Sequence, residues 1–133
     1  MKKKIEVVGV PGVLFLIWFA GLWILSSLPG EEVPLPQIPH IDKVGHFGYF
    51  MAGGFLLAWF LRQALGWRVG FVVLIAVTTL AAIGAFDEIH QLFTRGRAGA
   101  DIFDWLADVL GALAGASGFL FIYGMFNTRA TDP

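Results

Sequence analysis

Long stretches without a charged side chain alternate with short polar segments along the 133-residue chain. Four windows contain no Asp, Glu, Lys or Arg, namely residues 7–30, 44–61, 69–86 and 109–128. Each window holds at least about 18 residues, the length at which an α-helix crosses the hydrocarbon core of a bilayer. The pattern therefore predicts an all-α integral membrane protein, built as a bundle of four transmembrane helices.

The residues between these windows set the expected ends of the helices. We expect helices over residues 8–28, 42–65, 67–93 and 102–126. Pro29 and Gly30 end the first helix, because proline cannot continue it. The segment 31–41 carries three prolines and is predicted to be an extended, solvated loop. The polar residues from 127 onward are expected to form a frayed tail.

The composition agrees with a membrane protein and narrows the possible chemistry. Hydrophobic residues make up 57% of the chain and charged residues 14%, and the mean hydropathy is +0.74, well outside the range of soluble domains. One transmembrane domain, residues 1–133, uses the whole chain. Cysteine is absent, which excludes disulfides, thiolate nucleophiles and cysteine-based metal sites. No nucleic-acid partner is expected.

The lysines at the start of the chain fit either a cleaved signal peptide or a retained first helix. The apolar run that follows is longer than the hydrophobic region of a typical signal peptide, and Ser26-Ser27-Leu28 offers no clear cleavage site. We therefore expect the first helix to be retained.

The distribution of Lys and Arg predicts the orientation. Six of these residues fall on one side of the predicted membrane and three on the other: Lys2, Lys3, Lys4, Arg62, Arg68 and Arg129 against Lys43, Arg95 and Arg97. The positive-inside rule places the six-residue side in the cytoplasm. Both termini are then cytoplasmic, and the other end of the bundle is extracytoplasmic.

Polar residues gather at this extracytoplasmic end. Three predicted helices each carry them at spacings of three, four or seven residues, which places them on one face of a helix. They are Asp42, His46 and Tyr49; Asp87 and Gln91, with Glu88 and His90 on neighbouring faces; and Asp101, Asp104 and Asp108. The loop between the third and fourth helices adds Arg95 and Arg97. The sequence therefore predicts a polar cluster at the extracytoplasmic end of the bundle.

Some of these side chains have a plain structural interpretation. Asp42 and Asp101 each stand where an N-cap belongs, and Asp104 falls at the third helical position, where a carboxylate favours the positive helix end. Lys43 is interpreted as an interfacial charge whose ammonium reaches toward water. Gly111 and Gly115 form a Gly-x-x-x-Gly pair, which we interpret as helix packing within the chain rather than as a dimer motif.

Three acids resist such an interpretation, because they lie deeper in the predicted helices. A lipid-facing charge at the centre of the bilayer costs about 2.5 to 3.5 kcal/mol. Asp87, Glu88 and Asp108 should therefore face the interior of the bundle. Buried carboxylates need partners, and Arg95, Arg97 and His46 are the nearest candidates by topology.

Three sequence strings resemble the VanZ-like family of small bacterial membrane proteins. They are IDKVGHFGYF, DEIHQLFTRGR and DWLADVLGALAG, and the resemblance covers residues 42–118. The family's polar signature falls on Asp42, Lys43, His46, Tyr49, Asp87, Glu88, Gln91, Arg97, Asp104, Asp108 and Gly111. The family commonly has Asn at the position of Asp108 and Pro at that of Arg95. The resemblance implies a bacterial cytoplasmic membrane protein. Its name-giving member is linked to low-level teicoplanin resistance, and no biochemical activity is settled for the family.

Two hypotheses for function follow. In the first, which we favour, the polar cluster binds an anionic membrane lipid or the headgroup of a lipid-linked cell-wall precursor. Lys43, Arg95, Arg97 and outward-facing helix N-termini would then bind phosphate. The expected ligand-binding residues are Asp42, Lys43, His46, Tyr49, Asp87, Glu88, Gln91, Arg95, Arg97, Asp104 and Asp108. Six acids at this end exceed the three cations, which opposes a phosphate unless protons or a cation intervene.

The second hypothesis is a hydrolase or transferase acting on a lipid phosphate substrate. Oxygen ligands suit a divalent cation such as Mg²⁺ or Ca²⁺, for which the candidates are Asp87, Glu88, Asp104 and Asp108. The catalytic candidates are Asp87, Glu88 and His46, with His46 or His90 as the base. No established catalytic motif is present. A transport path is a third alternative, opposed by the scarcity of polar residues in the rest of the four helices.

Overall fold

A computed structural model describes residues 2–33 and 38–128 of the chain. It contains four long helices: α1 (Lys2–Ser27), α2 (Ile41–Leu65), α3 (Val69–Gln91) and α4 (Ile102–Thr128). A short 3-10 helix, η1 (Gly30–Glu32), follows α1, and the described residues contain no strand. Each long helix contains a segment that is long and apolar enough to cross a membrane. The predicted all-α bundle of four candidate membrane spans is confirmed.

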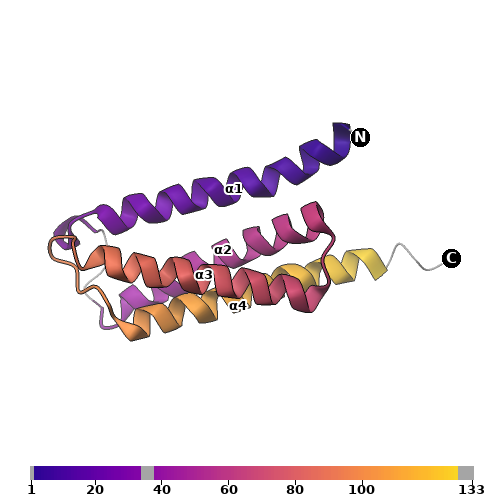
Figure 1. Ribbon diagram of the computed structural model, residues 1–133. Coiled ribbons are helices and arrows are strands. Elements are labelled where there is room, and N and C mark those ends of the chain that lie inside the picture. Colours follow the sequence, from indigo (N-terminus) through magenta and orange to yellow (C-terminus); the bar gives the residue numbers. More distant parts are fainter. Residues whose placement is uncertain (1, 34–37, 129–133) are drawn as a thin grey trace.

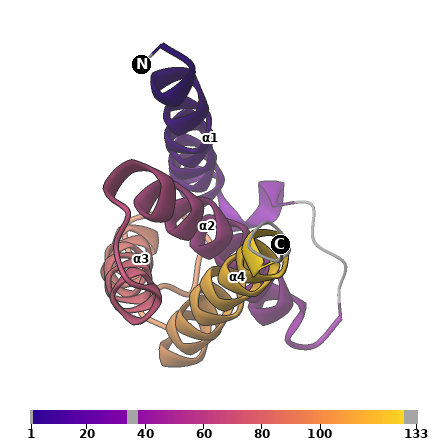
Figure 2. The same ribbon diagram turned by 90° about the vertical axis from the view of Figure 1, so that its right-hand side faces the viewer.

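The four helices run side by side along one axis (Figure 1). The start of α1 and the end of α4 lie at one end of the bundle, and the connections from α1 to α2 and from α3 to α4 lie at the other. Helices α2, α3 and α4 form the compact part, and α1 leans away from it toward its N-terminus (Figure 2). Large apolar side chains on the outer faces, such as Leu16, Phe86 and Phe121, are exposed, as expected of surfaces that meet lipid.

Helices α2 and α4 pack closely because glycines remove the side chains between them. A Cβ added at Gly111 would overlap the backbone carbonyl oxygen of Phe47, and one at Gly115 would overlap that of Met51. The Gly-x-x-x-Gly pair therefore packs within the chain, as predicted.

Helix α1 is attached to α2 by a reciprocal pair of hydrogen bonds. The indole Nε1 of Trp18 donates to the Tyr49 carbonyl at 2.9 Å, and the Tyr49 hydroxyl donates to the Trp18 carbonyl at 2.8 Å. The Trp18 ring lies over Gly53, where a Cβ would meet its Cζ2 atom at 2.5 Å. These contacts fix the position of α1 along its axis relative to the first half of α2.

Several predicted boundaries need correction. Helix α1 already begins at Lys2, and α4 continues to Thr128, two residues into the expected tail. The expected extended loop contains the η1 turn at Gly30–Glu32, which the Val33 amide closes by donating to the Gly30 carbonyl. The parts of the loop and tail at residues 34–37 and 129–133 lie outside the described residues.

Candidate functional site

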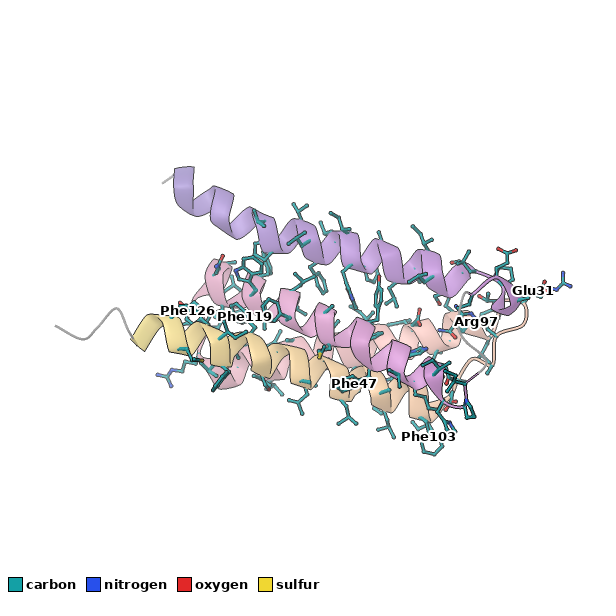
Figure 3. All side chains as sticks on the ribbon, turned by 180° about the vertical axis from the view of Figure 1, so that it is seen from behind. Glu31, Phe47, Arg97, Phe103, Phe119 and Phe126 are labelled. Carbon is teal, nitrogen blue, oxygen red and sulfur yellow. The ribbon has the colours of Figure 1, made fainter. Side chains whose placement is uncertain are left out.

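The predicted polar residues meet at the end of the bundle where α1 and α3 end and α2 and α4 begin. We call nine of them the polar cluster: Asp42, Lys43, His46, Asp87, Glu88, Gln91, Asp101, Asp104 and Asp108. Figure 3 labels Arg97 and Glu31 at this end, and Phe119 and Phe126 at the opposite end. Asp87, Glu88, Gln91, Asp104 and Asp108 are buried.

Lys43, in the first turn of α2, joins the acids of two helices. Its Nζ lies 2.8 Å from Asp104 Oδ1, 2.9 Å from Asp101 Oδ2 and 3.3 Å from Asp42 Oδ2. The hydrogen bond from Lys43 lowers the pKa of the Asp101 carboxyl below its ordinary value, and the Phe103 amide adds to this effect. Lys43 therefore pairs with three acids of the polar cluster while its side chain stays 24% exposed, and its interpretation as an interfacial charge did not include these partners.

The two predicted N-caps have different outcomes. Asp101 precedes α4, and its Oδ1 accepts a hydrogen bond from the Phe103 amide at 2.8 Å, which is the geometry of a cap. Asp42 lies inside α2, whose N-cap is His40 in the left-handed conformation at φ 62°. The capping prediction is confirmed for Asp101 and wrong for Asp42.

His46 and Asp108 form a buried pair between α2 and α4. The imidazole Nδ1 lies 3.0 Å from Asp108 Oδ1, and the Asp108 side chain is fully buried. Room for its second oxygen comes from Gly84 on α3, where an added Cβ would meet Asp108 Oδ2 at 2.6 Å. The expected interior position of Asp108 and the nomination of His46 as a partner for the deep acids are confirmed.

Asp87 and Glu88 each have one oxygen fixed by the protein and one without a hydrogen-bond partner. The Gln91 amide donates to Asp87 Oδ2 at 2.8 Å, and the backbone amide of Asp101 donates to Glu88 Oε2 at 2.7 Å. Among the described residues, Asp87 Oδ1, Glu88 Oε1 and Asp108 Oδ2 are buried without a hydrogen-bond partner. Because buried polar atoms are normally paired, the oxygens of Asp87 and Glu88 are candidates for contact with a ligand, whereas Asp108 Oδ2 packs against Gly84.

The two loop arginines do not pair with these acids in the described part of the chain. Arg97 donates from Nη2 to the Leu25 carbonyl at 2.7 Å and from Nε to the Leu28 carbonyl at 3.3 Å. It therefore satisfies carbonyls at the C-terminal end of α1. The Arg95 side chain is exposed. The proposed pairing of Arg95 and Arg97 with the buried carboxylates is wrong, since α1 supplies carbonyl acceptors that the sequence did not reveal.

His90, named as a possible base, lies apart from the polar cluster. Its Nε2 is 3.1 Å from the Ser27 hydroxyl, and its ring stacks on Trp23 with centroids 4.3 Å apart. The Thr94 hydroxyl donates to the Ser26 carbonyl at 3.2 Å. These contacts connect the end of α3 to the end of α1, so His90 has a structural role.

A cavity of about 230 Å³ opens beside the polar cluster, between α1, α2 and the end of α3. It is lined by Leu22, Leu25, Ser26, Val33, Asp42, Gly45, His46, Tyr49, Phe50, Asp87, Gln91 and Arg97. Ser26 was missed by sequence reasoning, although its buried hydroxyl has no hydrogen-bond partner. A buried serine near a helix end carries no sequence signal that separates it from a packing residue.

His46, Asp87 and Glu88 approach one another closely enough to share a ligand. One potential ligand atom from each lies within 4.8 Å of the other two. Asp104 and Asp108, also named as metal candidates, are instead bound to Lys43 and His46. The structure therefore groups two of the four expected metal candidates with a histidine.

The fold and site define a multi-pass α-helical membrane protein with a buried polar cluster at one end of its bundle. The model of the VanZ/LLP1 family matches residues 5–124, and the chain belongs to that family. No curated protein and no solved structure matched the chain.

Proposed function

We propose that the chain binds the phosphorylated headgroup of an anionic envelope lipid, or of a lipid-linked cell-wall precursor, in the cavity beside the polar cluster. The observation that carries this proposal is the mixed lining of that cavity. Leu22, Leu25 and Phe50 contribute apolar surface. The lining also includes the polar residues His46, Gln91 and Arg97 and the acids Asp42 and Asp87. An apolar cleft with a few convergent polar groups is typical of ligand sites.

The size of the cavity favours a headgroup over a larger ligand. Its volume of about 230 Å³ is below the range of about 300 to 1,000 Å³ that encloses a drug-sized molecule. A whole glycopeptide antibiotic does not fit. A contribution to teicoplanin resistance would therefore act through the bound lipid or precursor rather than through capture of the antibiotic.

Arg97 is the residue we expect to contact phosphate. Its guanidinium carries five N–H donors, and two of its nitrogens, Nε and Nη2, are used on α1 carbonyls. Neither bond uses Nη1, which retains two donors, and Arg97 lines the cavity while α1 fixes the orientation of its guanidinium. A guanidinium held in this way suits the oxygens of a phosphate.

We also propose that the polar cluster faces the extracytoplasmic side of the bacterial cytoplasmic membrane. The positive-inside rule supports this orientation. Arg62 and Arg68 lie at the end of α2 and just before α3, away from the polar cluster. Arg62 is fixed there by the Tyr123 ring, 5.0 Å from its guanidinium carbon. A headgroup would then enter from the outer leaflet.

The test is lipid retention by the purified protein, measured by native mass spectrometry after incubation with phosphatidylglycerol, a polyprenyl phosphate or zwitterionic phosphatidylcholine. Arg97→Gln should weaken retention of the two anionic lipids by about 10-fold or more, the loss expected for a charged hydrogen bond. Arg95→Gln is the matched control and should retain them at the wild-type level.

Because Arg97 also holds α1, a second variant keeps every charge and fills the cavity. Leu25→Trp should reduce binding of both anionic lipids while leaving the thermal unfolding temperature nearly unchanged. Wild-type retention in both Arg97→Gln and Leu25→Trp, or equal retention of phosphatidylcholine, would contradict the proposal.

A lipid phosphate hydrolase or transferase is the second candidate function. It is favoured by one observation, the approach of His46, Asp87 and Glu88 at the cavity wall. Release of inorganic phosphate from a polyprenyl diphosphate, present in the wild type and absent in Asp87→Asn, would support it. Lipid binding without release of phosphate would contradict the enzyme and support only the binding function.

A further inference from the structure

We infer that His46, Asp87 and Glu88 together bind one divalent transition-metal ion at the inner wall of the cavity. The three residues come from α2 and α3, and one ligand atom of each lies within 4.8 Å of the others. His46 and Asp87 line the cavity, and Glu88 is buried beside them. An ion held here would have one side toward the protein and one side toward the cavity.

The unpartnered oxygens point to a ligand independently of that grouping. Asp87 and Glu88 are only 3% and 4% exposed, yet Asp87 Oδ1 and Glu88 Oε1 have no hydrogen-bond partner within residues 2–33 and 38–128. The other oxygen of each carboxylate is held by a protein donor. A carboxylate fixed by one oxygen presents the second in a defined direction, which is how metal ligands are oriented.

His46 is oriented in the same way. Its Nδ1 faces the buried Asp108 carboxylate at 3.0 Å, which leaves Nε2 as the nitrogen available to an ion. A carboxylate that accepts the other ring N–H fixes both the tautomer and the plane of a metal-binding histidine. Asp108, expected from sequence to be a direct ligand, is in this arrangement the positioning residue behind His46.

The ligand set selects the kind of metal. Magnesium and calcium prefer sites made of oxygen ligands, whereas an imidazole nitrogen beside two carboxylates suits ions such as Zn²⁺ or Mn²⁺. Bonds to such ligands are about 2.0 to 2.2 Å long for Zn²⁺. Separations up to 4.8 Å between ligand atoms therefore require only small side-chain movements to close around one ion.

The charge balance of the polar cluster supports a cation. Six carboxylates, those of Asp42, Asp87, Glu88, Asp101, Asp104 and Asp108, are offset by Lys43 and, across the cavity, by Arg97. A divalent ion offsets two of the uncompensated charges. This inference deepens the proposed function and rests on it for one step, in which a lipid phosphate occupies the open side of the ion.

Metal binding is tested on detergent-purified protein carrying a tag without histidines. After removal of metal with a chelator, the protein is titrated with Mn²⁺ or Zn²⁺ and metal content is measured by elemental analysis. We expect one ion per chain and a rise in the thermal unfolding temperature. Pulsed electron paramagnetic resonance of bound Mn²⁺ should show coupling to a histidine nitrogen that is lost in His46→Gln.

Three variants separate the loss of a direct metal ligand, the loss of the residue that orients His46 and the loss of a negative charge elsewhere. Glu88→Gln should lower Mn²⁺ affinity at least 10-fold, and Asp108→Asn should lower it by about 10- to 100-fold through the orientation of His46. Glu32→Gln is the matched control, because this exposed acid of η1 lies outside the polar cluster and does not line the cavity, and it should leave the affinity unchanged. If a ligand variant fails to fold, the nitrogen coupling in the wild type still decides the question.

The inference is overturned if the wild type binds no stoichiometric metal, if bound Mn²⁺ gives the spectrum of the aqueous ion, or if Glu32→Gln weakens binding as much as Glu88→Gln. Measuring metal uptake and phosphatidylglycerol retention on the same protein separates the two proposals. A protein that retains the lipid but takes up no metal in the titration removes the metal site and leaves headgroup binding, whereas a protein that takes up metal but retains no lipid does the reverse.

Discussion

The buried and partly buried acids of the polar cluster each have at least one carboxylate oxygen bonded to a protein donor. Lys43 binds Asp101 and Asp104, His46 binds Asp108, and a side-chain or backbone amide fixes one oxygen each of Asp87 and Glu88. Breaking a buried charge pair leaves an uncompensated charge. Each of these pairs is therefore expected to contribute to the order of the site as well as to ligand binding.

Asp101 allows the contribution of one such pair to be measured by pH. Its pKa in the folded protein is lowered by Lys43, so the charged form stabilises the fold above the ordinary pKa of 3.8. This stability is lost as the pH falls through the folded-state pKa. Asp101→Asn removes the charge and keeps an oxygen for capping. We expect it to unfold at a lower temperature than the wild type at about pH 7, with the difference shrinking as the pH falls below the ordinary pKa of 3.8.

The measurement is thermal unfolding of both proteins in the same detergent across that pH range. Asp101→Ala, which also removes the cap, should cost about 0.5 to 2 kcal/mol more at every pH. A difference between wild type and Asp101→Asn that stays constant down to low pH would show that the charge on Asp101 does not stabilise the fold.

At the scale of elements, two kinds of attachment hold the bundle together. Helices α2 and α4 meet backbone to backbone over glycines, whereas α1 is held by the Trp18 and Tyr49 hydrogen bonds and by Arg97 at its C-terminal end. The cavity lies between α1, which is attached by these few hydrogen bonds, and α2 with the end of α3. Helix α2 supplies His46, Tyr49 and Phe50 to the wall of the cavity, and α2 is held in turn by its close packing against α4.

A pair of glycine substitutions on α4 tests that packing. Gly115→Ala places a Cβ against the Met51 carbonyl and should destabilise the protein by about 1 to 3 kcal/mol, the usual cost of overpacking. Gly118→Ala is the matched control, since nothing lies within 4 Å of its added Cβ. Alanine there should be neutral or should stabilise by about 0.5 to 1 kcal/mol. Equal unfolding temperatures for the two variants would show that α2 and α4 are not packed this closely.

The elements also show what sequence could and could not predict. Charge-free windows identified four helices because the bilayer imposes both a length and a polarity on each span. Spacing along each helix predicted which polar residues share a face, and the order of the four spans placed Asp42, His46 and Asp108 at the same end of the bundle. The partners across helices were harder, because they depend on how each helix is rotated and on how deeply it sits. The three acids that pair with Lys43 were therefore not predicted, and the carbonyls of α1 that bind Arg97 carried no sequence signal.

At the scale of the whole molecule, the proposed orientation places the polar cluster outside the cytoplasm. The chain has no cysteine, so single cysteines introduced at exposed positions report their own accessibility. Glu31→Cys, at the end of the bundle that contains the polar cluster, should react with a membrane-impermeant maleimide added to intact spheroplasts. Arg68→Cys, at the other end, should react only after the membrane is opened. The reverse labelling pattern would show that the topology is the opposite of the proposed one.

The most direct test of the account is an experimental density map of the protein in a lipid phase that contains a polyprenyl phosphate. We predict headgroup density in the cavity between Arg97 and His46, with the acyl chain leaving along the apolar wall at Leu22 and Leu25. A cavity closed by rearranged side chains, with lipid density confined to the outer faces of the bundle, would contradict the account.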